Sequence, residues 1–252
     1  MNKELVLEDV RLTALKGSSV DSFRNKVNDY LPVDSWMEAE DEDFLFDVNV
    51  TGLNSKGKKR VRMAGLLMLG EAAAIEDVLP NYLLTYTEHN ISGGIVKKIT
   101  SKDPGAPENC YEFHGDVYDR LCADLKTNFS LIVHDRNTLG YVHLVLRELL
   151  AKILVAADFD YKGGVIVEKH PDRLVYSFPG VMDKIITEPI RALSDDVGMG
   201  TSVRLFNLLG YLEPKEEKMR GMYDIWSKQG WKAPTIDVNS LAKRVTITLP
   251  MR

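Results

Sequence analysis

The run from Tyr141 to Ala157, YVHLVLRELLAKILVAA, is the feature that most constrains the fold of this chain. As a helix it is apolar around most of its circumference, and its polar side chains form one narrow stripe. The stripe consists of His143, Arg147, Glu148 and Lys152. Such a helix is stable in water only when other elements cover it on several sides. The run therefore predicts a core helix in a globular domain.

Size and composition favour a globular protein without a structural metal or disulfide. At 252 residues the chain can form one large domain or two small ones around a substantial hydrophobic core. The two cysteines, Cys110 and Cys122, lack metal-ligand spacing, which suits a reducing compartment. The N-terminal residues lack a signal-peptide core, and no run of about 18 apolar residues occurs. We expect a cytoplasmic protein that does not enter a membrane.

Hydrophobic periodicity divides the chain into a helical leader at residues 1–60 and an α+β domain at residues 61–252. In the leader, residues 19–31 predict a helix with a Ser or Asp cap, and residues 41–48 predict a helix or a short strand. From residue 61 we expect a short apolar helix and then a second segment closed by Pro80. The other segments expected are helices at 108–125, 141–157, 201–210 and 216–230, a strand at 82–88, a hairpin at 164–180 and a closing strand at 244–250. This order predicts an α+β layer, with helices on one face of a sheet.

The stretch GLNSKGKK at residues 52–59 has the glycine and lysine spacing of a phosphate-binding loop. Lys59 stands where a hydroxyl should bind magnesium, and no helix begins directly at this point to supply its N-terminal amides. The stretch therefore predicts a solvated basic turn. The net charge of -5 gives no overall attraction for nucleic acid. A nucleic-acid accessory module that uses residues 56–62 remains one alternative, and its affinity should fall steeply with salt.

The remaining polar residues give no motif for zinc or nucleophilic chemistry. The histidines at 89, 114, 134, 143 and 170 never occur at metal-ligand spacing, and no serine elbow or Cys/His couple is present. No metal site is expected. The stretch SDDVGMG at 194–200, with Asp195, Asp196, Gly198 and Gly200, predicts an ordinary loop, with a lid or phosphate loop as the alternative.

Glu148 and Lys152 are the most informative polar pair. They stand at i and i+4 with the acid first, the favourable order for a helical ion pair worth about 0.2–0.5 kcal/mol when exposed. The residue types alone leave two interpretations open: a pair that stabilises a packed helix, or part of an active site.

Several segments together resemble one protein family. They are MAGLLMLGEAAAIEDVLPNYLLTYTEH (63–89), RELLAKILVAADFDYKGGVIVEKHPDRLVYSFPGVM (147–182), RLFNLLGYLE (204–213) and MYDIWSKQGWKAPTI (222–236). They are similar to the C-terminal region of bacterial ATP-binding proteins that carry an AlbA- or Schlafen-type DNA-binding domain. Members of this family are described as transcriptional regulators or as RecG-related helicases. The resemblance covers nearly the whole chain but lacks the DNA-binding domain, so we expect DNA contact only through a domain absent from these residues.

The resemblance implies a GHKL-type ATPase fold, with the ATPase-like half at about residues 125–252. The implied fold class is α+β, a GHKL-like two-layer sandwich with a mixed sheet and helices on one face, preceded by a helical leader. In the family, a helix carries a Glu as water-activating base and an Asn four residues later as magnesium ligand. Glu148 matches the base, whereas Lys152 replaces the Asn, and an ammonium cannot coordinate a cation. Of the His-Arg-Asp that follows, only Asp158 is retained.

The glycine positions of the family are only partly retained. Gly180 matches an Asn-Pro-Gly turn, with Phe178 in place of the Asn. The family's phosphate-cradling Gly-Ser-Gly corresponds to Glu216, Glu217 and Lys218, and two carboxylates would repel a triphosphate. The family's Arg-Asn-Pro corresponds to residues 198–200.

The resemblance therefore implies a degenerate ATP-binding domain of a transcriptional regulator that does not hydrolyse ATP. The expected cofactor list is empty, and a homodimer is a candidate assembly. The main alternative is a functional ATPase with ATP and magnesium, in which Glu148, Lys152, Asp158 and Gly180 contact the nucleotide and residues 194–200 form the lid. An open pocket beside Glu148 would favour this alternative, and a Lys152 ammonium held on Glu148 would favour the first interpretation.

Overall fold

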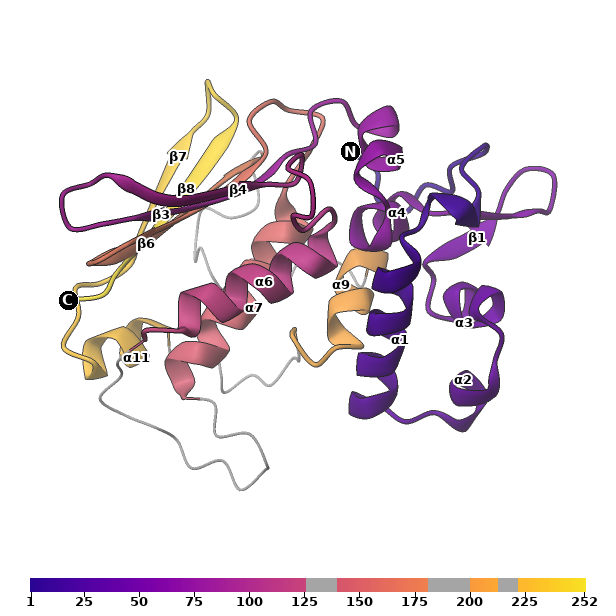
Figure 1. Ribbon diagram of the computed structural model, residues 1–252, viewed down its shortest axis with the longest axis horizontal. Helices are drawn as coiled ribbons and strands as arrows, with labels where there is room; N and C mark the ends of the chain where they lie inside the picture. The colour runs from indigo at the N-terminus through magenta and orange to yellow at the C-terminus, as the bar shows by residue number, and fades with distance from the viewer. Residues whose placement is uncertain (126–139, 181–199, 213–221) are drawn as a thin grey trace.

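The computed structural model describes residues 1–125, 140–180, 200–212 and 222–252 (Figure 1). The Glu216–Lys218 stretch and most of the stretch 194–200 lie outside these ranges. The N-terminal part contains η1 (Leu12–Ala14), α1 (Gly17–Tyr30), α2 (Asp34–Glu38), α3 (Asp41–Asp47), β1 (Thr51–Leu53), β2 (Lys59–Val61), α4 (Met63–Leu69) and α5 (Ala72–Val78). It is followed by β3 (Leu84–His89), β4 (Ile95–Thr100), α6 (Cys110–Cys122), α7 (Tyr141–Ala156), β5 (Val165–His170), β6 (Arg173–Pro179), α9 (Thr201–Asn207), α11 (Met222–Lys228), β7 (Thr235–Asn239) and β8 (Arg244–Pro250).

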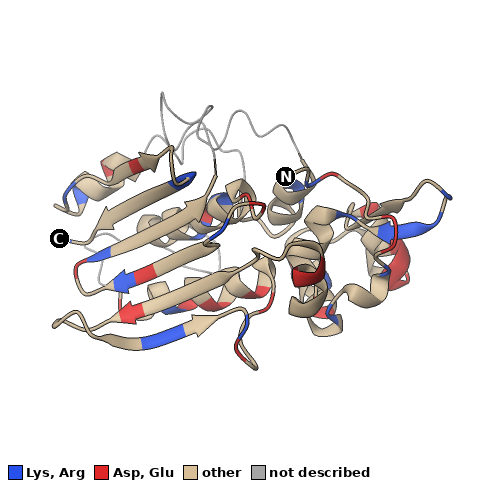
Figure 2. Ribbon diagram, turned by 90° about the horizontal axis from the view of Figure 1, so that it is seen from above, with Lys and Arg blue, Asp and Glu red and all other residues tan. Residues whose placement is uncertain are grey.

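One mixed sheet organises the second part of the chain. Its strand order is β4-β3-β5-β6-β8-β7, with β3 parallel to β5 and the other neighbours antiparallel. Along β8 buried and half-buried residues alternate, which gives the sheet one buried face and one partly open face. Helices α6 and α7 lie along the buried face, and the strands lie in front of them in the view of Figure 2. The expected α+β fold, a two-layer sandwich with helices on one face, is confirmed.

Helix α7 is the core helix that its sequence predicts. Most of its residues are buried, including Leu146, Leu149, Leu150 and Ile153. It packs between the sheet and the neighbouring helices, with closest contact to α6. Because α7 is covered on several sides, its polar stripe lies at the boundaries between elements rather than on a free surface.

The N-terminal part packs onto the second part through α4, whose residues are all buried. Gly65 lets α4 lie close to the residue before β1, because a Cβ at this position would lie 2.2 Å from the Val50 carbonyl oxygen. Strand β2 pairs with β1 and spans residues 59–61, so the boundary expected after residue 60 falls inside it. Helices α4 and α5 continue the helical region beyond that point (Figure 1).

The basic stretch at residues 52–59 forms the β1–β2 hairpin turn, as the sequence predicts. Gly57 has a φ of 69°, and the Asn54 side chain accepts hydrogen bonds from the backbone N–H groups of Lys56 and Lys58. Lys59 Nζ lies 2.6 Å from Asp43 Oδ1 at the acidic start of α3 (Figure 2). Part of the basic charge is therefore neutralised within the protein.

Two local expectations need correction or refinement. The N-cap of α1 is Lys16, which makes no side-chain cap, so the predicted Ser or Asp cap is wrong. Residues 41–47 form a helix and not the short strand that was the other expectation for this segment. None of the helices in the described ranges has the length and hydrophobicity that a membrane crossing requires.

Candidate functional site

The predicted pair on α7 is in direct contact and is largely withdrawn from solvent. Lys152 Nζ lies 2.9 Å from Glu148 Oε1, and the side chains are 5% and 15% exposed, respectively. No acceptor in the described ranges meets hydrogen-bond geometry with Lys152 Nζ, so the contact is an ion pair at short distance. Burial raises the energetic cost of losing either charge well above that of an exposed pair.

Asp158 and Gly180 lie together at the C-terminal end of α7. The Asp158 backbone N–H donates to the Pro179 carbonyl oxygen at 2.9 Å. The Gly180 N–H donates to the Lys243 carbonyl oxygen, also at 2.9 Å. A Cβ at Gly180 would lie 3.8 Å from the Ala156 carbonyl oxygen. The four predicted site residues therefore form two groups along α7, Glu148 with Lys152 and Asp158 with Gly180.

A shallow pocket of about 240 Å³ lies beside Asp158 at this end of α7. It is lined by Met1, Asn2, Lys3, Val155, Ala156, Ala157 and Asp158. Neither Glu148 nor Lys152 contributes to its lining. The N-terminal amino group of Met1 lies 3.1 Å from Asp158 Oδ2, so this carboxylate already has a cationic partner.

Lys3 caps the C-terminus of α7, a contact that the sequence does not reveal. Its Nζ donates to the carbonyl oxygens of Leu154, at 3.4 Å, and Val155. The negative end of the helix dipole favours a cation at this position. Lys3 is partly buried as a residue, but its ammonium group is enclosed, and this desolvation lowers its pKa to about 8.

Arg147, the residue before Glu148, connects α7 to α6 and to Gly210. His114 Nε2 lies 2.9 Å from the Arg147 carbonyl oxygen and donates a hydrogen bond to it. The Arg147 guanidinium donates to the Gly210 carbonyl oxygen at 3.2 Å and lies over the Tyr211 ring. These contacts hold the backbone next to Glu148 in place.

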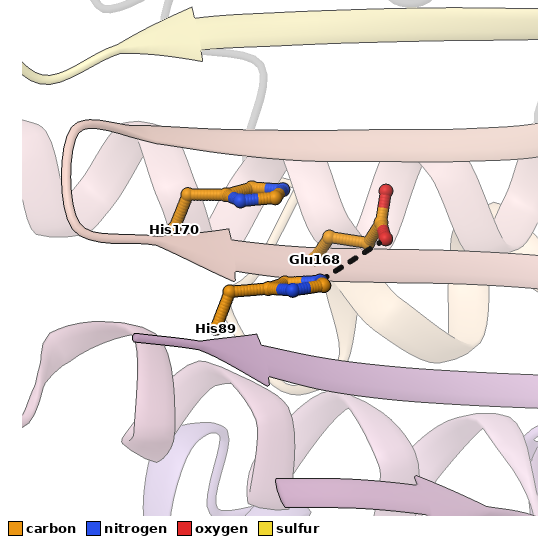
Figure 3. A group of neighbouring side chains, drawn as sticks. All are labelled: His89, Glu168 and His170. Atoms are coloured by element: carbon orange, nitrogen blue, oxygen red, sulfur yellow. Dashed lines mark hydrogen bonds and ion pairs between the residues drawn. The ribbon is translucent and has the colours of Figure 1, made fainter. Parts of the chain in front are cut away.

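A second cluster of functional side chains lies on the open face of the sheet. His89 Nε2 lies 3.3 Å from Glu168 Oε1, and the rings of His89 and His170 are stacked at 4.2 Å (Figure 3). His89 ends β3, and Glu168 and His170 come from β5. The sequence does not reveal this cluster, because the two histidines are distant in the chain. The signal that could have been used is the Glu168-x-His170 spacing, which places both side chains on one face of a strand.

Comparison with known proteins finds a family model that matches the N-terminal region and a solved structure with a similar fold. Neither assigns an activity. Residues 1–85 match the model of a domain of unknown function, DUF8451. The crystal structure of the DIP2311 protein from Corynebacterium diphtheriae is similar, with a TM-score of 0.67 and 17% sequence identity. The similarity covers 98% of this chain and 40% of the DIP2311 chain, so this chain spans less than half of that protein. The search of curated proteins finds no match.

Proposed function

We propose that this chain is a degenerate GHKL-type ATP-binding domain of a transcriptional regulator, which retains the sandwich and does not hydrolyse ATP. The contact of Lys152 with Glu148 at 2.9 Å carries this proposal. A water-activating carboxylate must be free to accept a proton from water. The carboxylate of Glu148 is instead neutralised by an ammonium from its own helix.

The same ammonium acts against magnesium. Mg²⁺ requires oxygen ligands at about 2.0–2.1 Å in octahedral geometry. Lys152 offers no oxygen and places a positive charge where the family has its ligand. Repulsion between two cations at short distance in a partly desolvated site is strong, so the pair and the metal would exclude each other.

The arrangement around Asp158 supports the proposal independently. The Lys3 ammonium, which lines the same pocket as Asp158, is bound to the last carbonyls of α7. A nucleotide at this position would have to displace these contacts.

The proposed setting of the domain follows from the family resemblance. DNA contact would come from a domain outside these 252 residues. The proposal places the assembly in the cytoplasm, with two copies of the domain forming a homodimer. Light scattering of the purified chain checks the homodimer, and a monomeric mass at micromolar concentration would contradict it.

We expect no micromolar binding when the purified chain is titrated with ATP and Mg²⁺ by calorimetry, and no phosphate release above background. A non-hydrolysable ATP analogue is titrated in parallel, so that binding and turnover are separated. Micromolar binding together with hydrolysis that Glu148→Ala abolishes would instead establish the functional ATPase alternative.

The role of Lys152 is tested by comparing Lys152→Asn with Lys152→Met. Both variants remove the ammonium, but only the asparagine returns an amide oxygen that can bind magnesium. We expect Lys152→Asn to bind Mg²⁺-ATP at least tenfold more tightly than Lys152→Met. Equal affinity in the two variants would mean that Lys152 is not what closes the site.

A further inference from the structure

Three side chains on the open face of the sheet come from the two parallel strands β3 and β5. The register pairs Thr87 with Glu168 and Glu88 with Lys169, so the next residues, His89 and His170, are neighbours. Along β5 the buried Val165 and Val167 alternate with Ile166, Glu168 and His170. Glu168 and His170 therefore point away from the helices, and Figure 3 shows the His89 ring on the same side.

The donor atoms of these residues are close enough to share one ion. One ligand atom each from His89, Glu168 and His170 can be chosen so that all lie within 4.8 Å of one another. Ligands of a tetrahedral zinc ion at about 2.0–2.2 Å lie roughly 3.3–3.6 Å apart. The distance between His89 Nε2 and Glu168 Oε1, 3.3 Å, already meets this requirement.

The histidine rings need only a local rearrangement to chelate. They are stacked with an angle of 5° between their planes, so their in-plane lone pairs run parallel rather than converging. A rotation of one or both rings about the Cβ–Cγ bond tilts the lone pairs toward a common point. All three residues are half-buried, which leaves room for this rotation on the solvent side.

The hydrogen bonding of His89 favours a cation between it and Glu168. His89 Nδ1 lies 3.4 Å from the Gly93 carbonyl oxygen, which can only accept a hydrogen bond. If Nδ1 carries the proton, Nε2 is an acceptor that faces the Glu168 carboxylate, another acceptor. Such a contact requires a proton or a metal ion between the two atoms, and an Nδ1–H bound to a carbonyl is the usual support of a metal-binding histidine.

The surrounding charges permit a cation at this point. Glu168 contributes one negative charge beside the two imidazole rings. Arg173 is the cross-strand neighbour of His170, but its guanidinium lies 3.1 Å from Asp172 Oδ1. The Arg173 guanidinium is thus engaged by an acid.

We propose that His89, Glu168 and His170 form a binding site for a divalent transition-metal ion, with Zn²⁺ as the reference ion. Two imidazoles and one carboxylate suit Zn²⁺ and its neighbours in the first row rather than Mg²⁺ or Ca²⁺. Three protein ligands leave a coordination position for water. This site departs from the expectation of no metal, and it does not depend on whether nucleotide binds near α7.

The test is calorimetric titration of the untagged, chelator-treated chain with Zn²⁺. We expect one ion per chain with micromolar affinity, weakened at least tenfold by Glu168→Gln and abolished by the double variant His89→Gln/His170→Gln. His143→Gln, which removes a histidine from α7, is the matched control and should leave the affinity unchanged. Circular dichroism of each variant confirms that the fold is retained.

Electron paramagnetic resonance of the wild-type chain with one equivalent of Cu²⁺ gives a readout that does not depend on variants. We expect hyperfine splitting from two imidazole nitrogens and displacement of bound Zn²⁺, since Cu²⁺ binds such ligand sets more tightly. Zn²⁺ binding that is saturable only above millimolar concentration, or that persists unchanged in the double variant, would overturn the proposal.

Discussion

Replacing Glu148 by Gln is expected to lower the free energy of unfolding by about 3 kcal/mol, near the lower end of the range for a broken buried ion pair. The reason is that Lys152, only 5% exposed, would retain an ammonium without a counter-charge. Glu148 itself is 15% exposed, which is why the lower end applies. Denaturant unfolding followed by the fluorescence of the buried Trp226 measures the effect.

The double variant Glu148→Met/Lys152→Met distinguishes a pair that packs a helix from a catalytic residue. Removing both charges together leaves no uncompensated ion, so its stability should be within about 1 kcal/mol of the wild type or above it. Together with the wild type and the single variants Glu148→Met and Lys152→Met, it completes a double-mutant cycle, in which we expect a large coupling energy.

The chain provides a matched control for this experiment. Arg120 and Asp116 also form an i,i+4 pair, with Nε 2.7 Å from Oδ2, but their side chains are 29% and 31% exposed. Solvent screening reduces the value of such a pair, so Asp116→Asn should cost less than about 1 kcal/mol. If Glu148→Gln costs no more than Asp116→Asn, Lys152 does not depend on Glu148, and the closed-site interpretation fails.

These two pairs show why the sequence predicts the contact and not its environment. The i,i+4 spacing is the same in α6 and α7. From spacing alone, both pairs would be expected to stabilise their helix only as much as an exposed ion pair does. Burial depends on what covers the helix, and the neighbours of α7 come from segments far apart in the chain. The same limit applies to Lys3, whose acceptors on α7 lie about 150 residues later.

The elements that the sequence predicts are those with a strong local pattern. Helix α7 and the hairpin of β5 and β6 have clear apolar periodicity, and both form as expected. The edge strands β4 and β7 were not expected. Their residues are mostly exposed, so neither carries the alternation that a half-buried strand requires. Pairing with a neighbour, rather than a pattern of their own, places these strands in the sheet.

The cluster on the open face illustrates a further limit. Metal-ligand spacing in a sequence detects ligands on one helix or loop, whereas His89 and His170 meet only through the parallel pairing of β3 and β5. The register of two strands that have β4, α6 and α7 between them in the chain is a property of the whole fold. Only the Glu168-x-His170 half of the cluster could be identified from local sequence.

The second large effect is expected on changing pH, through His114. This residue is 1% exposed, donates from Nε2 to the Arg147 carbonyl oxygen, and stacks on Tyr211. Its Nδ1 is buried, with no hydrogen-bond partner in the described ranges, so protonation would place an unsatisfied N–H in the core. Burial, with a smaller contribution from the Arg147 charge, lowers the pKa of His114 to about 4.

The direction of the effect follows from the two pKa values. Between about pH 6.5 and pH 4 the unfolded chain binds a proton at His114 that the folded chain does not, so stability falls as the pH is lowered through this range. From pH 7 to pH 5 the loss is about 2 kcal/mol from this group. The pKa values of His143 and His170 are also lowered in the folded state, and they add to the same trend.

His114→Gln isolates the contribution of His114, because glutamine can still donate to the Arg147 carbonyl oxygen but does not titrate. We expect this variant to be less stable at pH 7, from lost ring packing, and to lose about 2 kcal/mol less than the wild type between pH 7 and pH 5. The ring of His143 is less buried than that of His114, so His143→Gln should change the pH dependence of the free energy of unfolding less than His114→Gln does. Urea unfolding at pH 5, 6 and 7 measures all three proteins above the range in which carboxylates titrate. An unchanged slope in His114→Gln would show that His114 does not hold α6 against α7 as a neutral donor, and the backbone next to Glu148 would then need another anchor.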